Sequence, residues 1–373
     1  MRKILIFIDW YKPAFKAGGP ISSIHNLTQL LGDQFNFHII TSSKDLNSHV
    51  NLKSIKTNIW QNVDKSKVMY LTKENQNVRT LKKIVDDINP DKIYLNGLFS
   101  YFFSILPCFL FKNNFEIIIN PRGMFGLSAL SHKRLKKSLF IKLTNIISLY
   151  KTICWHVSND AEFKELNGNI KQVYKYQIIP NVPKNLIFNR KKRINKNELC
   201  LISVCRINEI KNIHFVLELL KGISIKCNYK IIGFIEDELY YKKLKNIVKL
   251  LPENIKVDFV GLLKNNEIEN EIVSSDLFIS SSLNENYGHS IVESLAIGVP
   301  VLISNNCPWF GLEKSSAGFR LPLDQVKFKE KILFFHNLNE DEYDKFNLGA
   351  RNYFNNNISS DLHKNNYLNL LSL

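Results

Sequence analysis

Residues 277–303 read LFISSSLNENYGHSIVESLAIGVPVLI. Two short apolar runs, Leu277–Ser280 and Val301–Ile303, flank a polar loop and an amphipathic segment, Ser290–Ile297. Short apolar runs bounded by turn residues predict buried strands, and the longer segment between them predicts a helix. A strand, a helix and a second strand in this order form the unit from which parallel sheets are built. The stretch therefore predicts an α/β fold.

The same alternation of strands and helices extends through the rest of the chain. In the second half it predicts further strands at Leu199–Val204, Lys230–Ile232 and Val257–Val260, and helices at Ile213–Leu220, Glu238–Lys249 and Asn266–Ser274. In the first half it predicts strands at Lys3–Ile8, Phe37–Thr41, Lys67–Leu71, Lys92–Leu95, Phe115–Asn120, Thr152–Val157 and Tyr176–Ile179, and helices at Ile21–Leu31 and Val78–Ile88.

A change in composition divides the chain. Residues 181–197 are rich in Pro, Asn, Lys and Arg and predict a linker, with the basic run at 190–193 as a solvated charge run. We expect residues 1–180 and 198–343 each to form one Rossmann-like domain, because a chain of 373 residues is too long for a single hydrophobic core. The C-terminal segment, 344–373, could cross back onto the first domain.

Composition narrows the function classes. Lys and Arg number 50 against 34 Asp and Glu, a formal charge of +16, which favours a nucleic acid, an acidic membrane face or a phosphorylated ligand. The chain shows no nucleic-acid-binding module, so nucleic acid is not expected as a partner. Six cysteines without a CxxC pair exclude the usual zinc spacings and a disulfide framework, which predicts a reducing compartment. No metal site is expected.

Targeting segments are also not expected. The apolar run at the amino terminus, Ile4–Ile8, is shorter than a signal peptide requires. The most apolar stretch, Leu98–Phe111, is interrupted by polar residues and falls short of the ~20 residues that span a bilayer. These features predict a cytoplasmic protein, with peripheral attachment to the inner face of the membrane as an alternative.

The loop and helix start in residues 285–293 carry the candidate chemistry. Gly288 lets backbone N–H groups approach a ligand, and a helix start near Ser290 favours phosphate. Glu285 and Glu293 are acceptors suited to pairs of sugar hydroxyls. On their own the two glutamates fit equally well as a helix-capping acid and an ordinary residue of an amphipathic helix.

This pattern resembles the donor-site motif of retaining glycosyltransferase family 4, which has the GT-B fold. The resemblance rests on two Glu separated by seven residues, with Gly288 between them and Gly298-Val299-Pro300 after them. It implies two Rossmann-like domains with parallel sheets facing across a cleft. It also implies that Glu285 contacts the donor sugar, that the amides after Asn286, at Tyr287 and Gly288, contact sugar or phosphate, and that Glu293 holds the ribose.

Two cations upstream strengthen the resemblance. Arg206 and Lys211 stand five residues apart between a predicted strand and helix, where the family places an Arg and a Lys on the donor diphosphate. A leaving diphosphate develops negative charge, which two cations can stabilise without a metal. The resemblance therefore implies that Arg206, Lys211 and Glu285 form the catalytic set. An isolated Arg–Lys pair would instead describe a solvated strand end.

The first domain carries weaker matches. Gly18 and Gly19 resemble the family's amino-terminal glycine loop, which brings donor phosphates and acceptor close to the backbone. Pro121-Arg122-Gly123-Met124 resembles a Pro-Arg-Gly-Met subgroup, in which Arg122 and Gly123 are acceptor-side candidates. Many relatives have a histidine at the Arg122 position, and an arginine cannot act as a base. His25, His132, His156 and His289 are candidates for a site histidine by location only.

A basic stretch, 132–137, precedes the apolar residues Leu139, Phe140, Ile141 and Leu143. It fits an anionic membrane surface as well as an ordinary exposed helix face. A membrane surface would suit a lipid-linked acceptor.

Taken together, the residues predict a metal-independent, retaining glycosyltransferase that needs no cofactor. The donor is a nucleoside-diphosphate sugar, and the acceptor is a glycan or a lipid-linked molecule. The subgroup resemblance implies bacterial envelope polysaccharide synthesis, meaning capsule, O-antigen or exopolysaccharide. The alternatives are a GT-B sugar-nucleotide epimerase and a non-catalytic protein that binds sugar nucleotides.

Overall fold

The computed structural model describes residues 1–126, 130, 134–184, 186 and 197–372. The basic run at 190–193 and His132 lie outside these residues. The chain divides into two compact units, the first made of residues 1–182 and 360–373 and the second of residues 183–359. The first unit thus includes the last helix of the chain, whereas residues 344–359 belong to the second unit.

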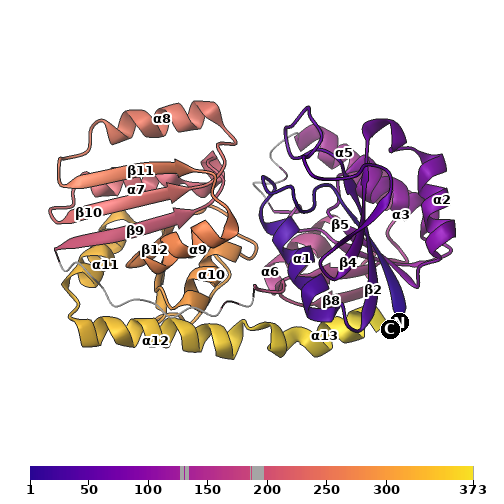
Figure 1. Ribbon diagram of the computed structural model, residues 1–373. Coiled ribbons are helices and arrows are strands. Elements are labelled where there is room, and N and C mark those ends of the chain that lie inside the picture. Colours follow the sequence, from indigo (N-terminus) through magenta and orange to yellow (C-terminus); the bar gives the residue numbers. More distant parts are fainter. Residues whose placement is uncertain (127–129, 131–133, 185, 187–196, 373) are drawn as a thin grey trace. The chain divides into compact units, whose positions relative to one another are not determined.

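The first unit is a sheet covered by helices on both faces (Figure 1). Its strands are β1 (Arg2–Ile8), β2 (Phe35–Ser42), β3 (Trp60–Val63), β4 (Ser66–Leu71), β5 (Lys92–Asn96), β6 (Glu116–Asn120), β7 (Cys154–Val157) and β8 (Lys175–Ile178). Its helical elements are α1 (Gly19–Leu31), η1 (Lys73–Asn75), α2 (Val78–Ile88), η2 (Tyr101–Ile105), α3 (Leu106–Phe111), α5 (Arg134–Ile146), α6 (Asp160–Asn169) and α13 (Ser360–Ser372).

Burial on both faces explains the apolar runs of this sheet. Among the described residues the strand order is β3-β4-β2-β1-β5-β6-β7-β8, and every pair except β3–β4 is parallel. In β1, Ile4 and Ile6 pack on the core beneath α1 and α13, whereas Leu5 and Phe7 pack on the core beneath α2 and α3. A strand covered on both sides therefore loses the alternation of polar and apolar residues.

The second unit repeats this plan with a smaller sheet (Figure 1). Its described strands run parallel in the order β11-β10-β9-β12-β13-β14. They are β9 (Glu198–Val204), β10 (Lys226–Ile232), β11 (Ile255–Gly261), β12 (Leu277–Ser280), β13 (Val301–Ser304) and β14 (Gly318–Leu321). The helical elements are η3 (Glu209–Lys211), α7 (Ile213–Leu220), α8 (Glu238–Val248), α9 (Asn265–Val273), α10 (His289–Ile297), α11 (Gln325–Asn337) and α12 (Glu340–Asn357).

Most predicted elements are present, and local chemistry sets their ends. Helix α1 begins at Gly19 with Pro20 in its first turn, where a missing N–H costs nothing. Asn77 caps α2 by accepting a hydrogen bond from Thr80 N at 2.9 Å, and Asn89 ends that helix in the left-handed conformation. The predicted strand at 152–157 was two residues too long, and the one at 230–232 was four too short.

The sequence predictions omitted several elements. β3 is a short, part-exposed strand that pairs antiparallel with β4, and β14 is a four-residue edge strand. The apolar stretch at 98–111 forms η2 and α3, whose buried side chains join the first core. No described helix combines the length and the apolar character that crossing a membrane requires.

Candidate functional site

The second unit gathers its predicted site residues at one edge of its sheet. Arg206 follows the carboxyl end of β9, and Lys211 ends the short helix η3 just beyond it. Glu285 lies in the loop that follows β12, the neighbour of β9 in the sheet. Parallel neighbours present their carboxyl ends at the same edge, which is where α/β sheets bind ligands. A backbone hydrogen bond from Leu283 N to Ile210 O, at 2.8 Å, joins the two loops.

Lys211 and Glu285 form an ion pair through Lys211 Nζ and Glu285 Oε2. The two side chains are only 16% and 18% exposed. Burial by itself would lower the pKa of Lys211, but the Glu285 carboxylate and the nearby Cys205 thiol outweigh this effect and raise it. Lys211 is therefore a fixed positive charge at the sheet edge.

Arg206 is paired with an acid that the sequence reasoning did not identify. Its Nη1 donates to Glu236 Oε1 at 2.6 Å, and Asn208 Nδ2 donates to the other oxygen of the same carboxylate. Arg206 is 41% exposed, so a ligand can reach the guanidinium from solvent. Glu236 follows β10, and its only signal in the sequence was the nearby Gly233 in a strand-end loop.

The loop before α10 is shaped by Gly288 and Tyr287. Gly288 has a φ of 77°, and a Cβ there would lie 2.8 Å from Ile291 Cδ1. The Tyr287 side chain is buried against Trp309, whose Nε1 donates to Tyr287 O at 2.7 Å. These contacts fix the backbone that enters α10 at His289, while Asn286 precedes them in a part-buried position. The first N–H groups of α10 provide donors and a positive dipole end.

Glu293 lies on α10 in a second acidic cluster. Burial raises the pKa of its carboxyl from the ordinary 4.5 to about 7; Lys184 lowers it and Glu269 raises it further. Lys184 Nζ is itself paired with Glu269 Oε1. Among the described residues Glu293 has no hydrogen-bond partner, so its oxygens are available to a ligand. Neither Lys184 nor Glu269 stood out in the sequence.

In the first unit the glycine loop lies beyond the carboxyl end of β1. Gly18 has a φ of 65° and precedes α1, which begins at Gly19. Asp9, at the same strand end, accepts a hydrogen bond from Ser100 Oγ at 2.6 Å, and burial raises the pKa of its carboxyl. The sequence reasoning did not single out Asp9.

Arg122 is held inside a network of amides. The residue is left-handed, with a φ of 56°, and its Nε donates to Asn96 Oδ1 at 2.6 Å while Nη1 donates to Asn181 Oδ1. Gly123 N donates to the buried carboxylate of Glu162. Two of the five N–H groups of the guanidinium are thus used by Asn96 and Asn181 within the first unit.

The described candidate histidines differ in their surroundings. His156 is fully buried; its Nδ1 lies 2.7 Å from the Tyr94 hydroxyl and its Nε2 lies 2.9 Å from Ile179 O. Burial lowers its pKa to about 3, which makes it a neutral structural residue. His25 Nδ1 lies 3.6 Å from Asp64 Oδ2, and the His289 ring at the start of α10 lies tilted against the Tyr287 ring, with the ring centroids 4.7 Å apart.

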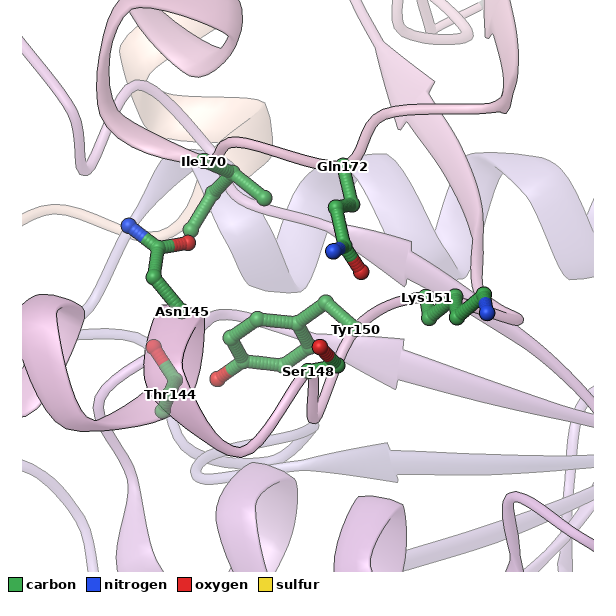
Figure 2. Close-up of a pocket in the computed structure, with 7 residues that line it drawn as sticks. All are labelled: Thr144, Asn145, Ser148, Tyr150, Lys151, Ile170 and Gln172. Carbon is green, nitrogen blue, oxygen red and sulfur yellow. The ribbon is translucent and has the colours of Figure 1, made fainter.

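The first unit also contains a small pocket that holds none of the predicted site residues (Figure 2). It is lined by Thr144, Asn145, Ser148, Tyr150, Lys151, Ile170 and Gln172. Within the ranges that the structure describes, no group of three His, Cys, Asp or Glu residues could hold a metal ion.

Parts of the chain are similar to known glycosyltransferases. Residues 186–346 match the family model for glycosyl transferases group 1. An uncharacterized glycosyltransferase of Methanocaldococcus jannaschii is 25% identical over 275 residues, which are 66% of this chain and 65% of that protein. The chain therefore spans about two thirds of the length of this curated relative.

Solved structures match the whole chain. The sucrose-phosphate synthase of Thermosynechococcus elongatus superposes with a TM-score of 0.76 at 14% identity, covering 99% of this chain and 98% of that one. Anabaena HepE, solved in complex with UDP-glucose, superposes with a TM-score of 0.70 at 13% identity over 100% of both chains. The chain has the GT-B fold.

In this GT-B chain, the second unit brings two cations and acidic side chains to the strand-end loops of its sheet, and a helix start follows one of these loops. Cations and helix starts are groups that favour phosphate. Each cation is already paired with a carboxylate, Arg206 with Glu236 and Lys211 with Glu285. These carboxylates hold the cations in place while leaving the site electrically balanced.

Proposed function

We propose that this protein is a retaining glycosyltransferase that moves a sugar from a nucleoside-diphosphate sugar to a glycan or lipid-linked acceptor. The observation that carries the proposal is the position of Arg206 and Lys211 at the carboxyl edge of the second sheet, where Lys211 pairs with Glu285 in the loop before α10. HepE, whose fold this chain shares, is described with UDP-glucose bound, which supports a nucleotide-sugar donor.

The chemistry follows from the charges at this edge. When the bond between the sugar's anomeric carbon and the phosphate oxygen breaks, the electron pair stays with the diphosphate. Arg206 and Lys211 stabilise that charge without a metal, and the N-terminal dipole of α10 adds to it. The departing phosphate takes the proton of the attacking acceptor hydroxyl on the same face of the sugar, so configuration is retained.

The two glutamates bind different parts of the donor. Glu285, held by Lys211, contacts the donor sugar, and the amides of Tyr287 and Gly288 contact sugar or phosphate. Glu293 binds the ribose, for which its free oxygens are suited. On the first unit, Gly18 and Gly19 admit the donor phosphates, and Arg122 and Gly123 lie on the acceptor side. The product would be an envelope polysaccharide of the capsule, O-antigen or exopolysaccharide type.

A thermal-shift panel of nucleoside diphosphates and their sugars tests donor binding. A ligand at 100 times its dissociation constant should stabilise the second unit by about 2.7 kcal/mol. Absence of a shift with every nucleotide would contradict the proposal. Incubation of the protein with the recognised donor, with and without glycan acceptors, separates transfer from the alternatives. Rearrangement of the donor sugar without an acceptor indicates an epimerase, and binding without turnover indicates a non-catalytic protein.

The variants Arg206→Ala and Lys211→Ala test the role of the cations. Each should lower turnover by about 100-fold to 1,000-fold, because a charge aimed at the leaving group is lost. The matched control is Lys230→Ala, which removes a comparable Lys–Glu pair, 2.5 Å to Glu271, from the same unit. Near-normal turnover in both site variants, or an equal loss in the control, would refute the assignment.

A further inference from the structure

Helix α5 presents an apolar stripe to solvent. Leu135, Leu139, Leu143 and Ile146 are 86%, 60%, 51% and 77% exposed. At about 100° per residue these four side chains fall within an arc of about 80° on the helix surface. Large apolar groups that gather on one exposed face mark a surface that binds a partner or a membrane.

The opposite face of α5 fixes this orientation. Ile141 and Thr144 are buried, and the Phe140 ring packs on Phe99 with ring centroids 5.7 Å apart. Lys137 Nζ lies 5.0 Å from the centroid of the same Phe99 ring. Because these contacts anchor the helix to the first core, the stripe cannot turn inward without losing them.

The charged side chains of α5 itself are all positive. Lys136 and Lys142 are exposed and lie at its two sides on the helix surface, and Arg134 begins the helix. Residues 134–147 contain no Asp or Glu, and Ile147, which is 56% exposed, extends the apolar surface past the helix end. An anionic bilayer offers acyl chains beneath a negatively charged surface, which complements an apolar stripe with lysines on both sides.

We propose that the outer face of α5, residues 134–147, docks on an anionic lipid bilayer. The apolar side chains enter the boundary between headgroups and acyl chains, and the flanking lysines contact lipid phosphates. The inference goes beyond the proposed donor site and does not depend on it, since none of the proposed donor residues lies on α5.

Vesicle sedimentation with the full chain tests the proposal. The protein should bind vesicles of phosphatidylcholine with phosphatidylglycerol, bind weakly to phosphatidylcholine alone, and bind less as salt rises. The stripe variant combines Leu135→Gln, Leu139→Gln, Leu143→Gln and Ile146→Gln. Its partition coefficient should fall at least about tenfold, because four apolar side chains no longer leave water.

Matched variants separate the stripe from general surface properties. The apolar control replaces four exposed residues of the second unit by glutamine: Leu239, Leu250, Val326 and Leu348. It should bind vesicles like the unchanged protein. Lys136→Gln with Lys142→Gln should weaken binding by about fivefold per lysine. Lys242→Gln with Lys249→Gln, which removes two exposed lysines elsewhere, should not.

Several outcomes would overturn the proposal. One is failure of the unchanged protein to bind anionic vesicles, and another is binding of the stripe variant as strong as that of its apolar control. If the stripe variant instead loses self-association in size-exclusion chromatography while its vesicle binding persists, the surface pairs two copies of the chain. Nucleotide-induced thermal shifts, measured on the same samples, show whether the donor site is intact. The result of this measurement does not depend on whether the protein binds vesicles.

Discussion

At the scale of single residues, the two candidate cations of the second unit lie in ion pairs. Arg206 and Lys211 each keep a carboxylate partner, so neither cation is left uncompensated before a ligand arrives. In the proposed function, an entering phosphate would replace one anion beside each cation with another. Glu293 differs, because its part-buried carboxyl has no hydrogen-bond partner among the described residues and only a weak opposing charge from Lys184.

Glu293 predicts a pH dependence of stability. Its folded pKa of about 7 lies above the ordinary 4.5, so the folded state keeps a proton that the unfolded state has lost between these values. The contribution of Glu293 to the free energy of unfolding should therefore fall as pH rises through this window, by up to about 3 kcal/mol. Urea denaturation at a series of pH values measures it, with the fluorescence of Trp309, the only tryptophan in residues 183–359, as the signal.

The variant Glu293→Gln should remove this contribution, so its free energy of unfolding should fall less between pH 4.5 and 7 than that of the unchanged protein. Glu330→Gln, which neutralises an exposed glutamate of the same unit, serves as the control and should leave the slope unchanged. If Glu293→Gln keeps the full slope between pH 4.5 and 7, the elevated pKa of Glu293 is wrong.

At the scale of elements, close backbone packing at the strand ends positions the site. Gly233 follows β10 with a φ of 147°, and a Cβ there would lie 1.9 Å from Cys205 O, at the residue before Arg206. Gly261 ends the neighbouring strand β11 with a φ of 81°, and a Cβ there would meet nothing within 4 Å. The first glycine is therefore required by both space and backbone conformation, and the second by backbone conformation alone.

The pair Gly233→Ala and Gly261→Ala separates these two requirements. Gly261→Ala should cost about 1–2 kcal/mol of stability, the usual penalty for a left-handed alanine. Gly233→Ala should cost more and should also weaken nucleotide binding, because the backbone at Cys205 and Arg206 has to move. Urea denaturation and nucleotide titration of both variants test this, and equal effects on binding would contradict it.

At the scale of the whole molecule, the last helix belongs to the first unit although it follows the second in sequence. Tyr367, Leu370 and Leu371 of α13 are buried in the core that lies beneath α1 and α13. The Tyr367 hydroxyl donates to Pro180 O at 2.9 Å, and the buried Lys92 Nζ donates to Leu370 O at 3.3 Å. The first unit is therefore incomplete without residues that are more than 180 positions away in the chain.

Removal of residues 360–373 should destabilise the first unit selectively. Calorimetry should show one unfolding transition shifted to lower temperature, while nucleotides still stabilise the second unit. Tyr367→Phe should cost only about 1 kcal/mol, since it removes one hydrogen bond and keeps the packing. Leu362→Ala, at a position that is 48% exposed, is the control and should change little. Equal loss of both transitions would contradict this division of the molecule.

The sequence by itself determined the α/β character, most strands and helices, and the placement of Arg206, Lys211, Glu285 and Gly288 in strand-end loops. These features depend on local periodicity and turn chemistry, which neighbouring residues carry. The amphipathic basic stretch was also visible, but apolar residues on both sides of α5 left open which face is buried. Only the packing of Phe140 on Phe99 decided that the leucines face outward.

Tertiary structure alone decided the partners of the charges. Lys211 and Glu285 are 74 positions apart, Arg206 and Glu236 are 30 apart, and Lys184 and Glu269 are 85 apart. Such pairs meet only after strands have taken their order in the sheet, and no local pattern records that order. For the same reason the sequence could not identify Glu236 or the elevated pKa of Glu293. It did suggest that the segment 344–373 could return to the first domain, but only the structure shows that residues 360–373 do so and that residues 344–359 do not. The sequence states which ionisable group each residue has, but the electrostatic surroundings of that group depend on burial and on neighbours that folding brings together.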